Sequence, residues 1–383
     1  MNRIKVMPVF GTRPDAIKMA PLVLELKKRP EFETVVCVSG QHRQMLDTVL
    51  DIFKLKPDYD LNVMRDRQTL TQITSNILCG IDEVLSREKP DLVLVHGDTS
   101  TAFTAALAAF YHKIKVGHVE AGLRTYDIHS PFPEEMNRRF VGLTAALHFA
   151  PTAANRENLL RESVPQETVY VTGNTEVDAI YHLVQDNYQF HDPVLRTLDF
   201  QNKRIIPMTA HRRENLGEPL EHICRAAKRI TELFPDTHIV YPVHLNPAVG
   251  EVAARILGDA PQVSLIDPIG ADDMYNLLAR ASLVLTDSGG VQEDSTALHK
   301  PCLVLRTETE RPEAVETGAI ALAGTQEEKI VSLAKTLLTD EAAYGRMVSA
   351  RNPYGDGRAS ERIADAILYS FGGKGSRPAD FEV

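Results

Sequence analysis

The sequence predicts an α/β protein made of two doubly wound domains, each built on a parallel sheet. Short apolar runs stop abruptly at polar residues and alternate with amphipathic helical patterns, which is typical of buried parallel strands. The alternation pauses in a polar, aromatic stretch at residues 187–202 and then restarts. A chain of 383 residues also exceeds the usual size of a single core.

The first domain is predicted at residues 1–173. Its first strand ends at a Gly11-Thr12-Arg13-Pro14 turn that leads directly into a helix, as expected for a tight strand-to-helix connection. This turn lacks the GxGxxG pattern of dinucleotide-binding proteins. The predicted strands are residues 4–10, 34–39, 92–95, 114–119, 147–150 and 169–172, and the clearest helices are residues 16–28, 69–87 and a segment that ends at Ile52.

The second domain is predicted at residues 174–357. Its predicted strands are residues 204–209, 238–243, 263–266, 283–286, 302–305 and 319–322, with helices between them. A last helix at residues 358–371 is expected to pack back on the first domain, and residues 372–383 are expected to form a flexible tail.

The composition predicts a cytoplasmic globular protein. Hydrophobic residues make up 43% and charged residues 25% of the chain, as in ordinary globular domains. The net charge of −10 argues against a nonspecific nucleic-acid binder but allows a local cationic pocket for a small anion. The 4 cysteines form no CxxC pair, so free thiols in a reducing compartment are expected. We find no signal peptide and no apolar run long enough to span a membrane.

Carboxylates follow the ends of the apolar runs in the middle of the first domain. Asp98 and Glu120 each come just after a predicted strand, and Glu134 follows the next polar stop. Since open α/β sheets bind ligands at the carboxyl ends of their strands, the three carboxylates suggest acid–base chemistry. A divalent metal held with His96 or His118 is the rival explanation, but no compact ligand spacing supports it, and no metal is predicted.

A phosphate-binding turn is predicted in the second domain. Ser288-Gly289-Gly290 follows a strand and opens a helix, where backbone N–H groups favour an anion. Asp294 on that helix would suit ribose hydroxyls, although a solvated helix carboxylate is an equally good interpretation. Cations and histidines at other strand ends suit a diphosphate, each with an ordinary surface or packing role as its alternative: Arg13, Lys18, His211, His244 and Arg311.

Several motifs occur together and in order along the chain. They are FGTRPDAIKMAPLV, VLVHGDTST, GHVEAGLRT, SPFPEEMNRR, VTGNT, TAHRREN, YPVHLNP, LTDSGGVQE, TERPEA and NPYGDG. Together they closely resemble the non-hydrolysing UDP-N-acetylglucosamine 2-epimerases of bacteria. The resemblance covers residues 5–371, and the ordered set is far more specific than any single motif.

The resemblance implies a GT-B-type fold, in which two Rossmann-like domains flank an interdomain active-site cleft, and a homodimer. It implies interconversion of UDP-N-acetylglucosamine and UDP-N-acetylmannosamine without a nicotinamide or other cofactor. UDP would be eliminated to give 2-acetamidoglucal and then added back, supplying N-acetylmannosamine for cell-surface polysaccharide. A second UDP-N-acetylglucosamine would act as an activator.

The same resemblance assigns roles to individual residues. Asp98, Glu120 and Glu134 would be the acid–base residues, and His211 would assist at the diphosphate. The UDP-sugar would be bound by Arg13, Lys18, His244, Ile269, Met274, Ser288, Gly289, Gly290, Asp294 and Arg311. The activator would be bound by Gln41, Gln44 and Arg67.

The sequence departs from the family pattern mainly at the nucleotide end. Asp15 stands where the family's GTRPE has its Glu, Asp294 stands for the ribose-binding Glu, and Met274 stands for a typical Phe. The family's RDTTERPE reads RTETERPE in this chain, so Thr307-Glu308 departs from the pattern. These changes leave open a related UDP-acetamido sugar as the substrate. A hydrolysing 2-epimerase, a GT-B glycosyltransferase and a non-catalytic UDP-sugar sensor also remain open as functions.

Overall fold

The computed structural model describes residues 3–41, 43–65, 67–373 and 375–383, with the side chains of residues 43–45 excluded. The chain divides into two units, one of Met1–Ala179 with Tyr354–Glu382 and the other of Ile180–Pro353 with Val383. The division falls inside helix α7 (Thr175–Leu183), six residues beyond the end of the predicted first domain at residue 173. A boundary inside a continuous helix has no mark in the composition, so the sequence could not place it.

The first unit contains a fully parallel sheet with strand order β4-β3-β1-β5-β6-β7-β8, and β2 also pairs with β1. Its central strands are rich in Val, Leu and Ile because both faces are covered. The strands are β1 (Ile4–Phe10), β2 (Phe32–Thr34), β3 (Cys37–Val38), β4 (Tyr59–Asp60), β5 (Leu92–His96), β6 (Lys115–Val119), β7 (Leu147–Ala150) and β8 (Val169–Val171).

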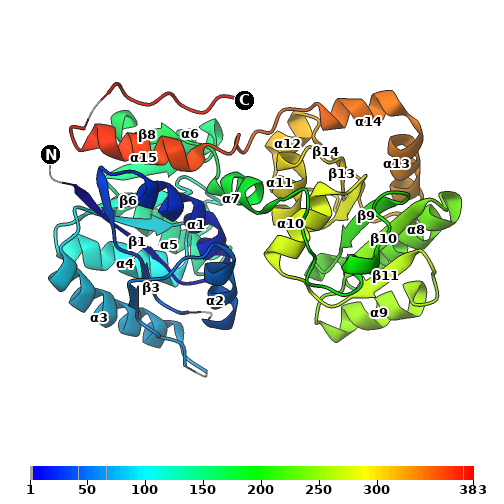
Figure 1. The fold of residues 1–383 in the computed structure, drawn as a ribbon, viewed down its shortest axis with the longest axis horizontal. Coiled ribbons are helices and arrows are strands. Elements are labelled where there is room, and N and C mark those ends of the chain that lie inside the picture. The colour runs from blue at the N-terminus through cyan, green and yellow to red at the C-terminus, as the bar shows by residue number, and fades with distance from the viewer. Residues whose placement is uncertain (1–2, 42, 66, 374) are drawn as a thin grey trace. The chain divides into compact units, whose positions relative to one another are not determined.

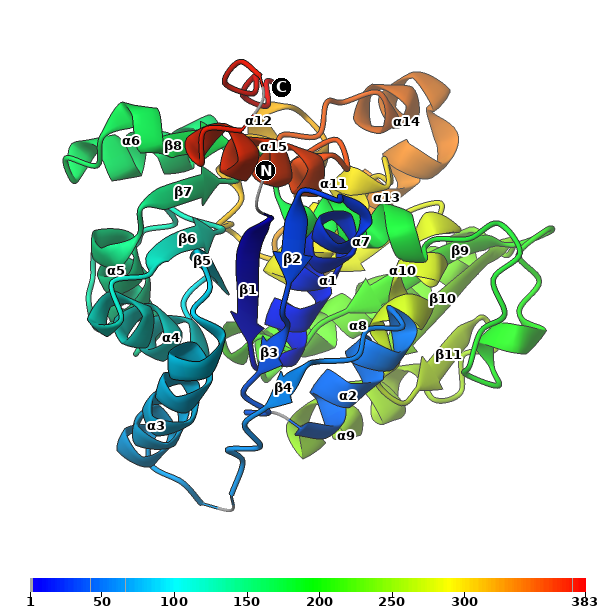
Figure 2. The same ribbon diagram turned by 60° about the vertical axis from the view of Figure 1, so that its left-hand side comes forward.

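Helices cover both faces of this sheet. Helices α3, α4 and α5 pack against one another on one side, and α1 packs against α2 and α15 on the other (Figures 1 and 2). Besides α7, the helices of this unit are α1 (Arg13–Lys28), α2 (Arg43–Ile52), α3 (Leu70–Glu88), α4 (Ser100–Tyr111), α5 (Glu134–Thr144), α6 (Ala153–Arg161) and α15 (Ala359–Ser370).

One predicted strand, at residues 34–39, is broken in the structure. The backbone N–H of Val36 donates to the Asp58 carboxylate at 2.8 Å, and the Val36 carbonyl accepts from the N–H of Tyr59 at 3.0 Å. These bonds separate β2 from β3, so the prediction of one continuous strand is wrong. Strand β4 was not predicted, because its two residues carry no apolar pattern.

Helix α15 packs on α1 and is capped by a residue from α7. The buried Asp178 carboxylate accepts the N–H groups of Ala359 and Ser360 at 3.1 and 2.7 Å. These bonds satisfy donors that would otherwise have no partner at the start of α15.

The C-terminal tail is bound along β8 and contradicts the prediction of a flexible segment. Asp380 accepts the N–H of Val171 at 2.9 Å, and the Phe381 N–H donates to the Val171 carbonyl at 2.7 Å. Arg156 also pairs with Asp380 at 2.9 Å. Because β8 lies at the edge of the sheet, its open backbone groups offer hydrogen bonds that a composition-based prediction does not consider.

The second unit contains a parallel sheet with strand order β11-β10-β9-β12-β13-β14. Residues of α8, α9, β9, β10 and α13 form its main buried apolar cluster. The elements are β9 (Arg204–Thr209), α8 (Glu218–Leu233), β10 (Thr237–Pro242), α9 (Pro247–Leu257), β11 (Val263–Ile266), α10 (Ala271–Ala279), β12 (Val284–Thr286), α11 (Gly289–Ala297), β13 (Cys302–Val304), α12 (Pro312–Glu316), β14 (Ile320–Leu322), α13 (Glu327–Thr339) and α14 (Glu341–Val348).

Each sheet has a topological switch point, where the connections leave a pair of neighbouring strands toward opposite edges. In the first unit it lies between β1 and β5, and in the second between β9 and β12. Open α/β sheets bind their ligands at the carboxyl ends of such strand pairs. Across the described ranges of the chain, we find no helix with the length and apolar character needed to cross a bilayer.

Candidate active site

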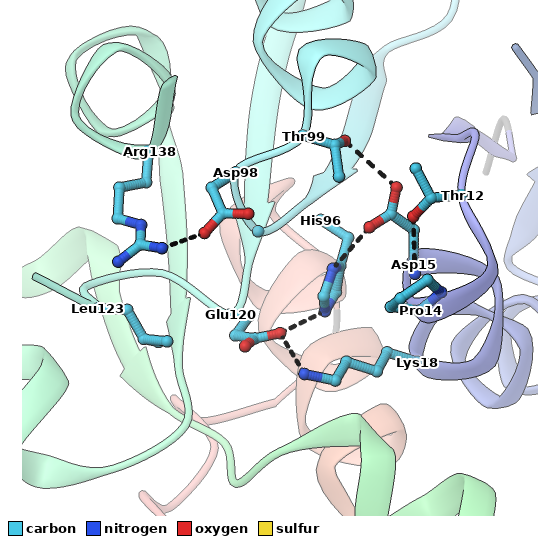
Figure 3. Close-up of a pocket in the computed structure, with 11 residues that line it drawn as sticks. Thr12, Pro14, Asp15, Lys18, His96, Asp98, Thr99, Glu120, Leu123 and Arg138 are labelled. Carbon is cyan, nitrogen blue, oxygen red and sulfur yellow. Dashed lines mark hydrogen bonds and ion pairs between the residues drawn. The ribbon is translucent and has the colours of Figure 1, made fainter. Parts of the chain in front are cut away.

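A pocket of about 190 Å³ opens at the switch point of the first unit (Figure 3). Its walls come from the end of β5, the turns after β5 and β6, the N-cap and first turns of α1, the N-cap of α4 and Arg138 of α5. The lining residues are Thr12, Pro14, Asp15, Lys18, His96, Gly97, Asp98, Thr99, Glu120, Leu123 and Arg138. The structure thus brings together Asp98, Glu120 and Lys18 of the predicted site residues.

Two threonines start the helices that border this pocket. Thr12 accepts the Asp15 N–H at 3.4 Å and caps α1, and Thr99 accepts the Ala102 N–H at 3.2 Å and caps α4. The Thr99 hydroxyl also donates to the Asp15 carboxylate at 3.2 Å. The two caps therefore join the N-termini of α1 and α4, which is a favourable electrostatic environment for an anionic group.

Glu120 is held by Lys18 and His96. Its Oε2 lies 2.8 Å from Lys18 Nζ and 2.7 Å from His96 Nε2 (Figure 3). Its backbone adopts a left-handed conformation with a φ of 62°, which is uncommon outside glycine and concentrates at functional sites. Burial alone would raise the pKa of Glu120, but Lys18 and His96 outweigh it and lower the pKa well below its usual value. Glu120 is therefore a carboxylate at neutral pH.

Asp98 lies in a different electrostatic environment. Its carboxylate accepts a hydrogen bond from Arg138, and its backbone carbonyl accepts one from Asn137 at 2.8 Å. Burial raises the pKa of Asp98, Arg138 opposes this effect, and the negative charge of Glu120 raises the pKa further. Two neighbouring carboxylates whose pKa values are driven apart are what acid–base catalysis requires.

Glu134 and Arg13 do not line this pocket. Acid–base transfer by Glu134 and nucleotide binding by Arg13 therefore stay predictions. Glu134 is half-buried in the first turn of α5, whose later residue Arg138 does reach the pocket. Arg13 is half-buried at the first position of α1. Polar residues at the start of a helix diverge around its axis, so proximity in sequence to a strand end does not determine where they point.

Three titratable residues of this pocket were not predicted from the sequence as acid–base or binding residues. Asp15 and Arg138 lie on helices, and His96, predicted only as a possible metal ligand, ends the buried strand β5. Positions at the starts of helices that border a switch point are the signal that could have identified Asp15.

The second unit has a polar centre at its own switch point. Asp287 is fully buried and accepts hydrogen bonds from the backbone N–H groups of His211 and Arg212 at 2.7 and 2.8 Å and from Asn215 Nδ2 at 3.0 Å. The rings of His211 and His244 stack with their centroids 5.0 Å apart. Burial lowers the pKa of His211, and His244 adds to this effect while Asp287 opposes it.

The N-terminus of α11 lies beside the same centre. Ser288 is its N-cap residue, and Gly289 is its first helical residue. A Cβ at Gly289 would lie 3.8 Å from the Arg212 guanidinium and 3.9 Å from that of Arg311, so the two arginines converge there. Arg311 is also paired with the buried Glu293. A helix N-terminus with two guanidinium groups is suited to a diphosphate.

The other predicted binding residues have varied environments. Asp294 is buried on α11, and Met274 and Ile269 are half-buried at and just before the start of α10. The Gln41 carbonyl oxygen accepts from the Thr101 hydroxyl at 3.0 Å, whereas Arg67 is exposed. The side chain of Gln44 lies outside the described part of the structure.

His191, Asp272 and Asp273 of the second unit are close enough to one another to hold a metal ion. The Asp273 carboxylate already accepts the N–H groups of His191 and Asp192 at 2.9 Å each. Tyr188 donates to both aspartates, at 2.7 and 2.8 Å. This group therefore serves to tie residues 188–192 to α10.

Comparison with known proteins identifies the family. The family model described as UDP-N-acetylglucosamine 2-epimerase matches residues 24–368. A Bacillus subtilis protein named UDP-N-acetylglucosamine 2-epimerase is 55% identical over 100% of this chain and 99% of its own length. A crystal structure of a UDP-N-acetylglucosamine 2-epimerase superposes with a TM-score of 0.94 at 53% identity, covering 100% of both chains.

The Neisseria meningitidis UDP-GlcNAc 2-epimerase, solved bound to UDP-GlcNAc, has a TM-score of 0.83 at 44% identity, with 95% of this chain and 100% of that chain covered. These matches confirm the resemblance seen in the motifs and the two-domain α/β fold class of GT-B type. Members with this name are isomerases. The chain belongs to the UDP-N-acetylglucosamine 2-epimerase family.

Proposed function

We propose that this enzyme interconverts UDP-N-acetylglucosamine and UDP-N-acetylmannosamine without net hydrolysis. The observation that carries the proposal is the pair of pocket carboxylates, Asp98 and Glu120, whose surroundings shift their pKa values in opposite directions. Inverting C2 requires groups that remove a proton from one face of the carbon and return one to the other face. The bound ligand of the Neisseria relative supports the choice of substrate.

In the proposed reaction a carboxylate takes the proton from C2, the electron pair of that bond forms the C1–C2 double bond, and the C1–O bond breaks. UDP leaves with the electrons of the C1–O bond, and 2-acetamidoglucal remains. The reverse addition delivers a proton to the opposite face of C2 and rejoins UDP to C1. Glu120, ionised at neutral pH, suits the accepting role, and Asp98, whose pKa is raised, suits the donating role.

We further propose that the second unit binds the nucleotide part of the substrate. The departing diphosphate needs N–H donors and positive charge, which the N-terminus of α11, Arg212 and Arg311 offer. His211, beside Asp287, would assist at the diphosphate. Asp294 would meet the ribose, and Ile269 and Met274 the uracil.

A proton NMR experiment in D₂O tests the reaction. With UDP-N-acetylglucosamine as the substrate, we expect UDP-N-acetylmannosamine with deuterium at C2 and no accumulation of free sugar. Free N-acetylmannosamine would instead indicate a hydrolysing 2-epimerase. An unchanged, unlabelled substrate would indicate a glycosyltransferase or another UDP-acetamido sugar as the substrate.

Activation by a second UDP-N-acetylglucosamine is also proposed. Gln41 is tied to the start of α4, since Thr101 of that helix contacts both Gln41 and Ser39, and Thr99, the N-cap residue of α4, lines the first unit's pocket. Sigmoidal dependence of rate on UDP-N-acetylmannosamine, made hyperbolic by trace UDP-N-acetylglucosamine, is the expected behaviour. A hyperbolic curve that does not respond to the trace nucleotide would refute this regulation.

We also propose that the enzyme is a cytoplasmic homodimer that supplies N-acetylmannosamine units for a cell-surface polysaccharide. Exposed apolar side chains on α4 and α5 support the dimer, with Tyr111 at 64% and Leu143 at 83% exposure. Light scattering of the purified protein tests it, and a mass of one chain would contradict it.

A further inference from the structure

We propose that His96 is a positioning residue, held as an imidazolium between Asp15 and Glu120, that keeps Glu120 ionised and aimed into the pocket. This inference rests on the proposed function, because it concerns the carboxylate to which proton transfer is assigned. We refer to Asp15, His96 and Glu120 as the imidazolium clamp.

The clamp places a carboxylate oxygen near each ring nitrogen of His96. Its Nε2 lies 2.7 Å from Glu120 Oε2, and its Nδ1 lies 3.7 Å from Asp15 Oδ1 (Figure 3). Asp15 is itself fixed, since its other carboxylate oxygen accepts from the Thr99 hydroxyl at 3.2 Å. The His96 side chain is 5% exposed, so water does not compete for either nitrogen. Glu120 is therefore oriented through His96 by the start of α1.

The charges around His96 come from every element packed against it. Asp15 and Lys18 come from α1, Asp98 from the turn after β5, and Glu120 from the end of β6. Two further charged residues contact this group. Arg138 on α5 pairs with Asp98, and Glu176 on α7 lies 3.4 Å from Lys18 Nζ. The neighbouring His118 on β6 is neutral, because burial lowers its pKa to about 3.

This arrangement favours a charged His96. Burial lowers the pKa of His96, but Glu120 and Asp15 outweigh it and raise the pKa to about 9. At neutral pH Glu120 is therefore paired with two cations, Lys18 and His96. Without them, burial would raise the pKa of Glu120 and favour its protonated form, which cannot act as a base.

A histidine NMR titration tests the clamp without reference to catalysis. In protein labelled at histidine Cε1, we expect the His96 signal to remain that of an imidazolium up to about pH 9. The signal is identified by its loss in His96→Gln. In Asp15→Asn, which keeps the shape of Asp15, the titration midpoint should fall by about one pH unit. That shift also identifies the signal if the His96→Gln variant fails to fold.

The pH profile of kcat/KM tests the use of the clamp. The His96→Gln variant retains an N–H donor but carries no charge, so the pKa of Glu120 should rise. We expect the acid limb of its kcat/KM profile to shift to higher pH by at least about one unit. The matched control is His112→Gln, because His112 Nε2 also lies 2.7 Å from a carboxylate, that of Asp82, but outside the pocket. Its profile should match the wild type.

Two results would overturn the inference. One is a wild-type His96 signal that titrates at or below pH 6.5, whatever the activity of the protein. The other is a His96→Gln profile identical to that of wild type. By contrast, an inactive protein whose His96 stays protonated to about pH 9 would support the clamp while refuting the proposed reaction.

Discussion

Replacing Asp98 by Asn should abolish most of the turnover and leave the fold and nucleotide binding intact. Asn has the shape of Asp, so its carbonyl oxygen can still accept from Arg138, and the backbone bond between the Asp98 carbonyl and Asn137 is unaffected. Arg138 also keeps its second partner, the buried Glu135 at 3.4 Å. What the amide cannot do is carry a proton to or from C2.

The expected loss follows from the role of the carboxylate. Loss of a general acid or base lowers the rate by about 10²–10⁴-fold, or about 2.7–5.5 kcal/mol in activation free energy. The weaker Arg138 contact should cost about 1 kcal/mol of folding stability or less, which is too little to unfold the protein. Turnover is measured by NMR on UDP-N-acetylglucosamine, and UDP binding is measured by calorimetry.

Asp82→Asn is the matched control for this variant. Asp82 is an exposed carboxylate that pairs with His112 outside the pocket, so its rate should equal the wild-type rate. If Asp98→Asn turned over within about threefold of wild type, Asp98 would not transfer a proton and the assignment would be wrong. If Asp98→Asn also lost UDP binding, its lower rate would reflect a disturbed structure and not the loss of a proton-transfer group.

Three further predictions concern the first unit, and one of them uses a control glycine in the second unit. Arg138→Met removes the cation that lowers the pKa of Asp98, so this pKa should rise. The limb of the pH–rate profile that Asp98 controls, identified by its absence in Asp98→Asn, should therefore move to higher pH. Gly122→Ala should lower the free energy of unfolding by more than about 3 kcal/mol, because a Cβ there would lie 2.2 Å from a backbone carbonyl oxygen at a φ of 91°. Gly318→Ala, at a φ of 77° with no atom within 4 Å, should cost only about 1 kcal/mol, and equal losses in urea unfolding would contradict the steric argument. Burial lowers the pKa of His118 to about 3, so the unfolded chain binds the extra proton below pH 6.5, and stability should fall toward pH 3 by up to about 1.4 kcal/mol per pH unit. If the slope of stability against pH were the same in His118→Asn as in the wild type, His118 would not contribute to that slope.

The sequence predicted the strands well where burial dictates the residues. Val, Leu and Ile runs such as Leu92–His96 and Ile4–Phe10 are covered on both faces, so their apolar pattern reports directly on the sheet. The break between β2 and β3 was missed because it depends on one side chain, Asp58, that arrives from 22 residues away in the chain. The bound tail was missed for a similar reason, since it depends on the open edge of β8.

The candidate site was predicted in part. Asp98 and Glu120 were identified because they follow strands, and the ends of neighbouring parallel strands meet at one edge of a sheet. Asp15 and Arg138 reach the same pocket from helices, where the direction of a side chain depends on how the helix is rotated against the sheet. That rotation is set by tertiary packing, so the sequence did not identify Arg138 as a pocket residue, and the role of Glu134 stays a prediction.

The cleavage of the C1–O bond is the step on which the proposed reaction depends, and positional isotope exchange measures it most directly. UDP-N-acetylglucosamine labelled with ¹⁸O in the bridge between C1 and the β-phosphorus is incubated with the enzyme and followed by phosphorus NMR. We predict that the label moves from the bridge to non-bridging β-phosphate positions while C2 epimerises, because UDP is free to rotate before it rejoins the glycal. Epimerisation with the label still wholly in the bridge would contradict the elimination mechanism.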